Sequence, residues 1–145
     1  MSRVLILVVM LAASGGCGTS GAQHHTTLLP GSKIGSMKSF YVVHRDGDPR
    51  NIERDIAQQL VELGFEARSG LVEPRDPTQY DAVVTYIDRY IWDMSMYCLQ
   101  LTLYVRDTRT GFITATGSSW RPSLVRKTPA GHAKILLTEL LGGER

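Results

Sequence analysis

The sequence has few cysteines, little net charge and no apolar run long enough to cross a membrane as a helix. Its 145 residues include two cysteines, Cys17 and Cys98, so a scaffold of several disulfides is excluded. The formal net charge is +2, and acidic and basic residues are interleaved along the chain, which argues against nucleic-acid binding. Hydrophobic residues make up 43% of the chain, which is enough for one globular domain with a packed core.

The longest apolar run lies at the N-terminus, from Val4 to Ala13. It is about half the length of the roughly 20 residues that a membrane-spanning helix needs. Arg3 precedes the run and small residues follow it, which is the layout of a secretory signal peptide. We therefore expect residues 1–16 to be a signal peptide and the protein to be exported.

The end of this segment resembles the lipobox of bacterial lipoproteins. Residues 13–17 read Ala-Ser-Gly-Gly-Cys, with small residues before a cysteine. The resemblance implies that Cys17 is the lipidation site, carries acyl chains such as palmitate and binds the protein to the lipid bilayer. Gly18 after the cysteine implies the periplasmic face of the outer membrane. Ser14 stands where an aliphatic residue is commonest, so cleavage to a soluble periplasmic protein remains the alternative.

Residues 17–36 are rich in Gly, Ser and Thr and show no hydrophobic periodicity, which predicts a flexible tether. His24 and His25 lie in this segment without a further ligand at metal-binding spacing, so we expect no metal site there.

Residues 37–142 carry the pattern of a single α+β domain. We expect strands at 37–44, 65–68, 81–92, 97–106 and 112–119. One helix is expected after Asp48 and up to Gly64, and a second from Thr128 to Gly142. The order β-α-β-β-β-β-α predicts a mostly antiparallel sheet with both helices packed on one face.

Alternation within the central strands predicts two contrasting faces. The predicted core face of the strand 97–106 consists of Tyr97, Leu99, Leu101, Leu103 and Val105. The opposite face is predicted to carry a cluster that folding alone does not account for, which makes it a candidate partner-binding face. Its members are Tyr86, Asp88, Tyr90, Trp92 and Tyr104. Packing of these aromatics across the strands is the alternative.

No motif for catalysis, phosphate binding or cofactor binding is present, so we expect no cofactor. Asp88 and Asp93 are not expected to converge as an acid pair, and His44 and His132 have the pattern of ordinary surface histidines. Cys98 is expected to be a small packed residue rather than a reactive thiol. The basic run 121–127 fits a solvated loop, or a contact with lipid head groups or cell-wall polymer.

The domain resembles a group of small uncharacterised bacterial lipoproteins. The residues that carry the resemblance are Tyr80-Asp81, 85–93, Arg106-Asp107 with Thr110-Gly111, and 115–117. The element order is also similar to the N-terminal domains of the Tol-system β-propeller protein and the curli secretion lipoprotein. These resemblances imply location and fold, and they carry little about activity.

From these features we expect a membrane-anchored periplasmic lipoprotein with a non-enzymatic role. It would bind another envelope protein or a cell-wall component, or take part in envelope assembly. One alternative is a soluble periplasmic enzyme whose site is assembled from residues distant in the sequence. Another is a structural subunit that self-associates through the edge of its sheet.

Overall fold

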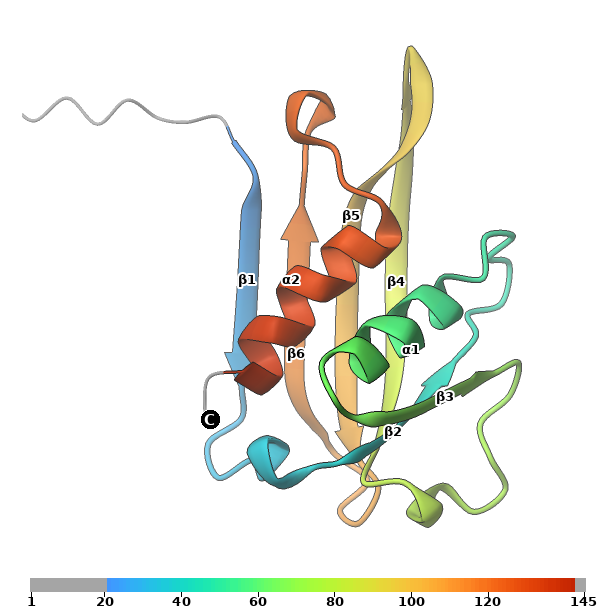
Figure 1. The fold of residues 1–145 in the computed structure, drawn as a ribbon, viewed down its shortest axis with the longest axis vertical. Helices are drawn as coiled ribbons and strands as arrows, with labels where there is room; N and C mark the ends of the chain where they lie inside the picture. Colours follow the sequence, from blue (N-terminus) through green and yellow to red (C-terminus); the bar gives the residue numbers. More distant parts are fainter. Residues whose placement is uncertain (1–20, 143–145) are drawn as a thin grey trace, which may run out of the picture.

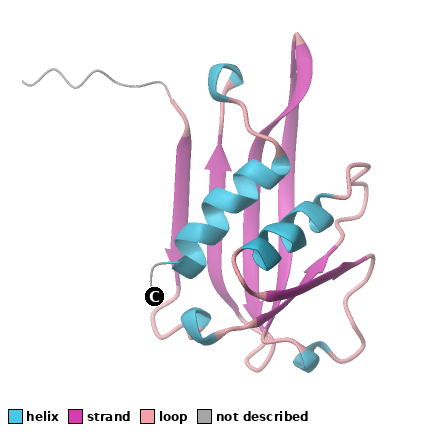
Figure 2. Cartoon of the chain, in the orientation of Figure 1, coloured by secondary structure: helices cyan, strands magenta, loops and turns pink. Residues whose placement is uncertain are grey.

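The computed structural model describes residues 21–142, which form one sheet with two helices packed against it. Both helices lie on the same face of the sheet (Figures 1 and 2), as the sequence predicted. The α+β class is confirmed. No helix in this part of the chain is long and apolar enough to span a membrane. The elements are β1 (Gln23–Leu28), β2 (Ser39–Val43), α1 (Ile52–Glu62), β3 (Glu66–Gly70), β4 (Ala82–Asp93), β5 (Ser95–Asp107), β6 (Ile113–Trp120) and α2 (Pro129–Gly142).

The sheet is mixed, which corrects the prediction of a mostly antiparallel one. Its strand order is β1-β6-β5-β4-β2-β3. The pairs β1–β6, β6–β5 and β5–β4 are antiparallel, whereas β4–β2 and β2–β3 are parallel. The β2–β3 pair results from the crossover through α1. The second parallel pair arises because the chain returns after β3 and places β4 on the other side of β2.

A sixth strand, β1, lies within the segment predicted to be a tether, so that prediction is wrong from Gln23 onward. β1 forms one edge of the sheet, with Gln23 opposite Trp120 and Leu28 opposite Ala115 of β6. Its side chains are mostly exposed, so it lacks the apolar alternation by which strands are recognised. The connection to β2 is also part of the fold, because Ile34 is buried in the core.

Each of the two helices buries one apolar stripe against the sheet. In α1 the buried apolar stripe consists of Ile52, Ile56 and Leu60; in α2 it consists of Ala133, Leu136, Leu137, Leu140 and Leu141. All of these belong to one core cluster with Leu101, Leu103 and Val105 of β5. Helix α1 begins at Ile52 rather than directly after Asp48, because Asn51 adopts a left-handed backbone conformation with φ of 56°.

A β-bulge in β5 determines which residues of β4 face the helices. Near the hairpin, Tyr90 pairs with Cys98, but the next pair joins Arg89 to Gln100. Leu99 is the extra residue of β5 at this bulge. Residues that pair directly across two strands point to the same face. The even-numbered residues of β4 therefore lie on the helix-covered face along the whole strand. From Leu101 onward, the odd-numbered residues of β5 share this face with them. Between the bulge and the hairpin turn, the even-numbered residues of β5 share it instead.

Candidate functional site

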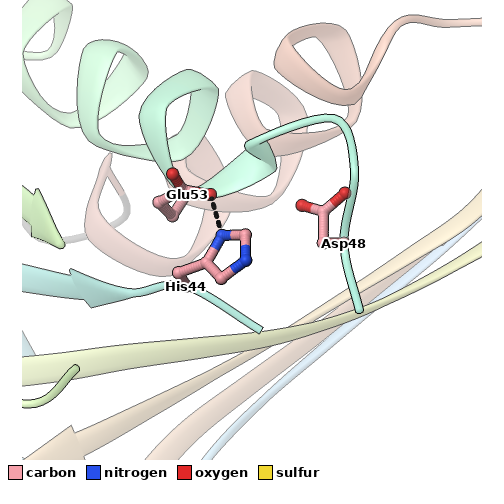
Figure 3. Close-up of side chains that lie close together, drawn as sticks. All are labelled: His44, Asp48 and Glu53. Atoms are coloured by element: carbon pink, nitrogen blue, oxygen red, sulfur yellow. Dashed lines mark hydrogen bonds and ion pairs between the residues drawn. The ribbon is translucent and has the colours of Figure 1, made fainter. Parts of the chain in front are cut away.

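A cluster of ionisable side chains lies where α1 begins, between the end of β2 and the middle of β4. His44 follows β2, Asp48 lies in the next loop, Glu53 is in the first turn of α1 and Tyr86 belongs to β4. Figure 3 shows His44, Asp48 and Glu53 converging, and one ligand atom from each lies within 4.8 Å of the others. Asp48, Glu53 and Tyr86 are buried and His44 is partly so. We call these four residues the junction cluster.

Asp48 is the residue of this cluster that fixes the start of α1. Its carboxylate accepts hydrogen bonds from the backbone N–H groups of Arg50 and Ile52, each at 2.8 Å, which is the role of a capping aspartate. It also accepts from the Tyr86 hydroxyl at 2.7 Å. Burial alone raises the pKa of the Asp48 carboxyl, but the hydrogen bonds from Ile52, Tyr86 and Arg50 outweigh it, so the pKa lies below its usual value.

The other members of the junction cluster are hydrogen-bonded to one another. The Tyr86 hydroxyl donates to Asp48 and accepts from the backbone N–H of Arg45 at 3.3 Å. Burial, and then the bond to Asp48, raise the pKa of Tyr86 well above its usual value, which keeps the phenol neutral. The Oε2 atom of Glu53 lies 2.9 Å from His44 Nδ1. The cluster therefore joins β2, α1 and β4 through buried polar contacts.

His44, Asp48 and Glu53 are the described residues that could hold a divalent cation, because imidazole nitrogens and carboxylate oxygens are common metal ligands. Both oxygens of Asp48 already accept backbone N–H groups, and Glu53 already contacts His44. A capping aspartate and a buried polar network account for the arrangement. Sequence reasoning missed it because Glu53 lies off the apolar stripe of α1, and Tyr86 is distant in the chain.

Two arginines adjoin the junction cluster. Arg45 forms a salt bridge with Asp88, with Nη2 and Oδ1 2.6 Å apart, and the guanidinium of Arg50 lies 3.8 Å from the centroid of the Tyr90 ring. Cys98 pairs with Tyr90 across the strands and is buried. Burial, and then the charge of Asp88, raise the pKa of the Cys98 thiol to about 12, so it is a poor nucleophile.

The prediction that Cys98 is a packed residue is thus confirmed. The prediction of its face is wrong, because the bulge at Leu99 turns Cys98 toward the helices. Among the described residues it is a free cysteine.

His132 was predicted to be an ordinary surface histidine and is instead fully buried in α2. Its Nδ1 lies 3.0 Å from Ser119 Oγ and its Nε2 lies 3.2 Å from the carbonyl oxygen of Cys98. A carbonyl oxygen only accepts, so Nε2 carries the proton and donates, and Nδ1 accepts from the Ser119 hydroxyl. Ser119 is also fully buried. This Ser–His pair has no route to a substrate and no acid on its second nitrogen, so it lacks the arrangement of a catalytic triad.

The structure divides the predicted partner-binding face between the two sides of the sheet. Tyr86, Asp88 and Tyr90 lie under the helices, because the bulge pairs Tyr86 with Leu103 and Asp88 with Leu101. Tyr104 pairs with Thr85 and points to the opposite side. The set therefore does not form one surface. Trp92 is the exposed aromatic of the set, at 71%.

The β4–β5 hairpin extends beyond the other strands and exposes apolar residues at its end (Figure 1). Met94 at its turn is 92% exposed. Arg126 ties the loop after β6 to this hairpin, donating to Ser95 Oγ and to the carbonyl oxygen of Asp93, each at 2.7 Å. Leu124, two residues before Arg126 in this loop, is 95% exposed. We call this set the tip surface: Trp92, Met94, Met96, Leu124 and Val125.

Cys17 and the predicted signal peptide lie outside the described residues. The structure therefore leaves both as predictions from the sequence.

Neither a protein-family model nor a curated protein sequence matches the chain. Solved structures share its fold. A single-residue variant of PelC from Paraburkholderia phytofirmans, a dodecamer, superposes with a TM-score of 0.59 at 14% identity, covering 82% of this chain and 98% of PelC. The PelC dodecamer in a second crystal form gives 0.58 at 15% identity, covering 83% and 97%. A PDZ domain protein from Parabacteroides distasonis gives 0.47 at 12% identity, covering 83% of this chain and 36% of that one.

Proposed function

We propose that this protein is a membrane-anchored periplasmic lipoprotein with a non-enzymatic binding or assembly role in the envelope. The observation that carries the proposal is the signal-like segment that ends in small residues and Cys17. The described domain supports a non-catalytic role. The Ser119–His132 pair is sealed in the core, and Asp88 and Asp93, which could have served as acids, contact arginines.

The anchor is tested by metabolic labelling of the cells with palmitate. We expect label on the wild-type protein and none on Cys17→Ala, because Cys17 provides the thiol and the new N-terminus that are acylated. Cys98→Ala is the matched control and should keep the label, since that thiol is buried. Label retained by Cys17→Ala would exclude the lipid anchor.

The fold also favours one form of this role, assembly from copies of the chain. PelC, which shares the fold over most of its length, is a dodecamer. In this chain β1 and β3 are the two edge strands, and an edge strand offers unpaired backbone N–H and C=O groups to a neighbour. We infer that copies of the protein associate through the β1 edge, because no further described element lies beside β1 on its outer side.

Site-specific photocrosslinking in the cell tests this assembly. A crosslinker at Leu28 of β1, which is exposed, should give products at multiples of the chain mass. The same crosslinker at Val61 on the outer side of α1, which is equally accessible, should give few of them. Products that contain only other proteins would favour a binding role without self-assembly. Equal self-crosslinking at both positions would contradict an interface at β1.

A further inference from the structure

The start of β1 and the tip surface lie at the same end of the molecule (Figure 1). Gln23 of β1 pairs with Trp120 of β6, and Trp120 pairs with Gln100 of β5. These three residues therefore mark one level across the sheet. From Gln100 the β4–β5 hairpin continues past this level to its turn at Met94. Strand β1 begins at this same end of the sheet.

Two lengths of chain can be compared from this common level. Six residue steps separate Met94 from Gln100, and six separate Cys17 from Gln23. At about 3.3 Å per residue, each spans at most about 20 Å. With a lipid anchor at Cys17, the distance from the bilayer to Gln23 is therefore at most about the length of the hairpin from Gln100 to Met94. Because strand β1 begins at Gln23, the segment available as a tether is much shorter than the sequence pattern indicated.

The tip surface has the composition of a membrane-contacting element. It gathers a tryptophan, two methionines, a leucine and a valine, and tryptophan concentrates at the bilayer interface. Met94 also has a backbone φ of 58°, a conformation for which glycine and asparagine are the usual residues. A fully exposed methionine in this position is unfavourable for folding and unfavourable in water. Contact with an apolar medium would offset the second of these costs.

The charge around the tip surface is positive. Arg121, Arg126 and Lys127 follow β6, and Asp93 is the one carboxylate in the hairpin end 92–97, so the local sum is three minus one, or +2. Arg126 is held beside the hairpin by its contacts with Ser95 and Asp93. Cations next to exposed apolar side chains are the arrangement that binds anionic head groups.

We propose that the tip surface docks on a lipid bilayer that contains anionic head groups, as a second membrane contact beside the acyl chains. The inference rests on the proposed anchor at Cys17, which sets the distance and the end of the molecule that faces the bilayer. Trp92 and Met94 enter the interfacial region, and Arg121, Arg126 and Lys127 contact head groups. In this orientation the β4–β5 turn faces the membrane, and the β5–β6 turn, which contains Phe112, faces away from it.

Fluorescence of the full lipidated protein tests this orientation. The sequence has two tryptophans, so Trp120→Phe leaves Trp92 as the single reporter. In vesicles of phosphatidylglycerol and phosphatidylcholine with brominated acyl chains, we expect a blue shift and strong quenching of Trp92. Mass spectrometry of the same sample reports the acyl chains on Cys17. An acylated protein with unquenched Trp92 overturns the docking while the anchor stands. A protein without acyl chains overturns the anchor, and docking is then decided by the next measurement.

Sedimentation with vesicles tests the surface without the anchor. The chain from residue 17 onward with Cys17→Ser contains the whole described domain, and we expect it to bind phosphatidylglycerol vesicles and to be released by salt. Trp92→Ser with Met94→Asn should weaken binding about tenfold or more. Asparagine suits the φ of residue 94, so this variant should fold. Phe112→Ser is the matched control, because Phe112 is 74% exposed in the β5–β6 turn, at the other end of β5 from the β4–β5 turn. Equal weakening by both variants, or binding to purified cell-wall polymer and not to vesicles, overturns the proposal.

Discussion

Replacing Asp48 by Ala is expected to lower the free energy of unfolding by about 2–4 kcal/mol. The change removes the cap of α1, which contributes about 0.5–2 kcal/mol, and it leaves the buried Tyr86 hydroxyl without its acceptor, which costs about 1–3 kcal/mol. The Asp48 carboxylate accepts from the Ile52 N–H at 2.8 Å and from the Tyr86 hydroxyl at 2.7 Å. Urea unfolding followed by far-ultraviolet circular dichroism measures the loss.

Asp76→Ala is the matched control for this change. Asp76 also accepts a backbone N–H, from Thr78 at 3.0 Å, but it is exposed at the start of a short 3-10 helix. We expect its loss to be under about 1 kcal/mol. A double-mutant cycle with Tyr86→Phe then isolates the bond between Asp48 and Tyr86, and a coupling of about 1 kcal/mol or more is expected. Equal losses for Asp48→Ala and Asp76→Ala would show that the junction cluster contributes little.

Replacing His132 by Ala is expected to cost about 2–5 kcal/mol. The imidazole is fully buried between α2 and the sheet, so its removal leaves a cavity. It also leaves the Ser119 hydroxyl and the Cys98 carbonyl without a partner. The same substitution at His25, which is exposed on β1, should change stability by less than about 0.5 kcal/mol. Comparable losses at the two positions would contradict the buried placement of His132.

His132 should also make stability depend on pH. Burial is the main cause that lowers the pKa of His132 below its usual 6.5, and the nearby charges of Arg121 and Lys127 act in the same direction. Below pH 6.5 the unfolded chain therefore binds more protons at this residue than the folded chain does. Stability from this group is complete above pH 6.5 and falls as the pH drops through and below that value. Subtracting the curve of His132→Gln from that of the wild type should isolate this fall. A difference that does not vary with pH between 7 and 5 would contradict it.

Acid unfolding at lower pH has a separate origin. The pKa values of Asp48 and Asp81 lie below their usual 3.8, so both remain ionised in the folded protein where the unfolded chain would take up protons. Their contribution is present above pH 3.8 and is lost as the pH falls below it. The loss that comes from Asp48 and Asp81 therefore begins at a lower pH than the loss that comes from His132.

Local patterns predicted the two helices and part of the core face of β5. The prediction that Tyr97 and Leu99 belong to that face is wrong, because the bulge at Leu99 leaves both outside the core cluster. Leu101, Leu103 and Val105 are buried as their alternation indicated. The correct predictions succeed because the spacing of the buried apolar residues lies within a single helix or strand. Strand β1 was missed for the same reason. The edge strand Gln23–Leu28 is paired with β6 although its side chains are mostly exposed. Its composition therefore resembles that of a linker.

The arrangement between elements was the part that the sequence did not reveal. Which face Tyr86 and Asp88 occupy depends on a single extra residue in β5, Leu99, whose bulge shifts the pairing by one. The junction cluster likewise depends on three separate segments meeting. Tyr86 contacts Asp48 and Glu53 across 38 and 33 positions of the chain. Neither spacing carries a local signal.

The pairing of β1 with β6 also has a consequence for the order in which the protein can fold. Gln23 pairs with Trp120, so the first strand of the sheet is held by one of the last segments to be made. A chain that is exported from its N-terminus delivers β1 early, yet β1 cannot find its partner until residues 113–120 have followed. Pairings of such long sequence separation close late and slowly. In the proposed export, the sheet would therefore stay open until β6 has followed, and the β1 edge, nearest the predicted lipid anchor, would be among the final parts of the fold to form.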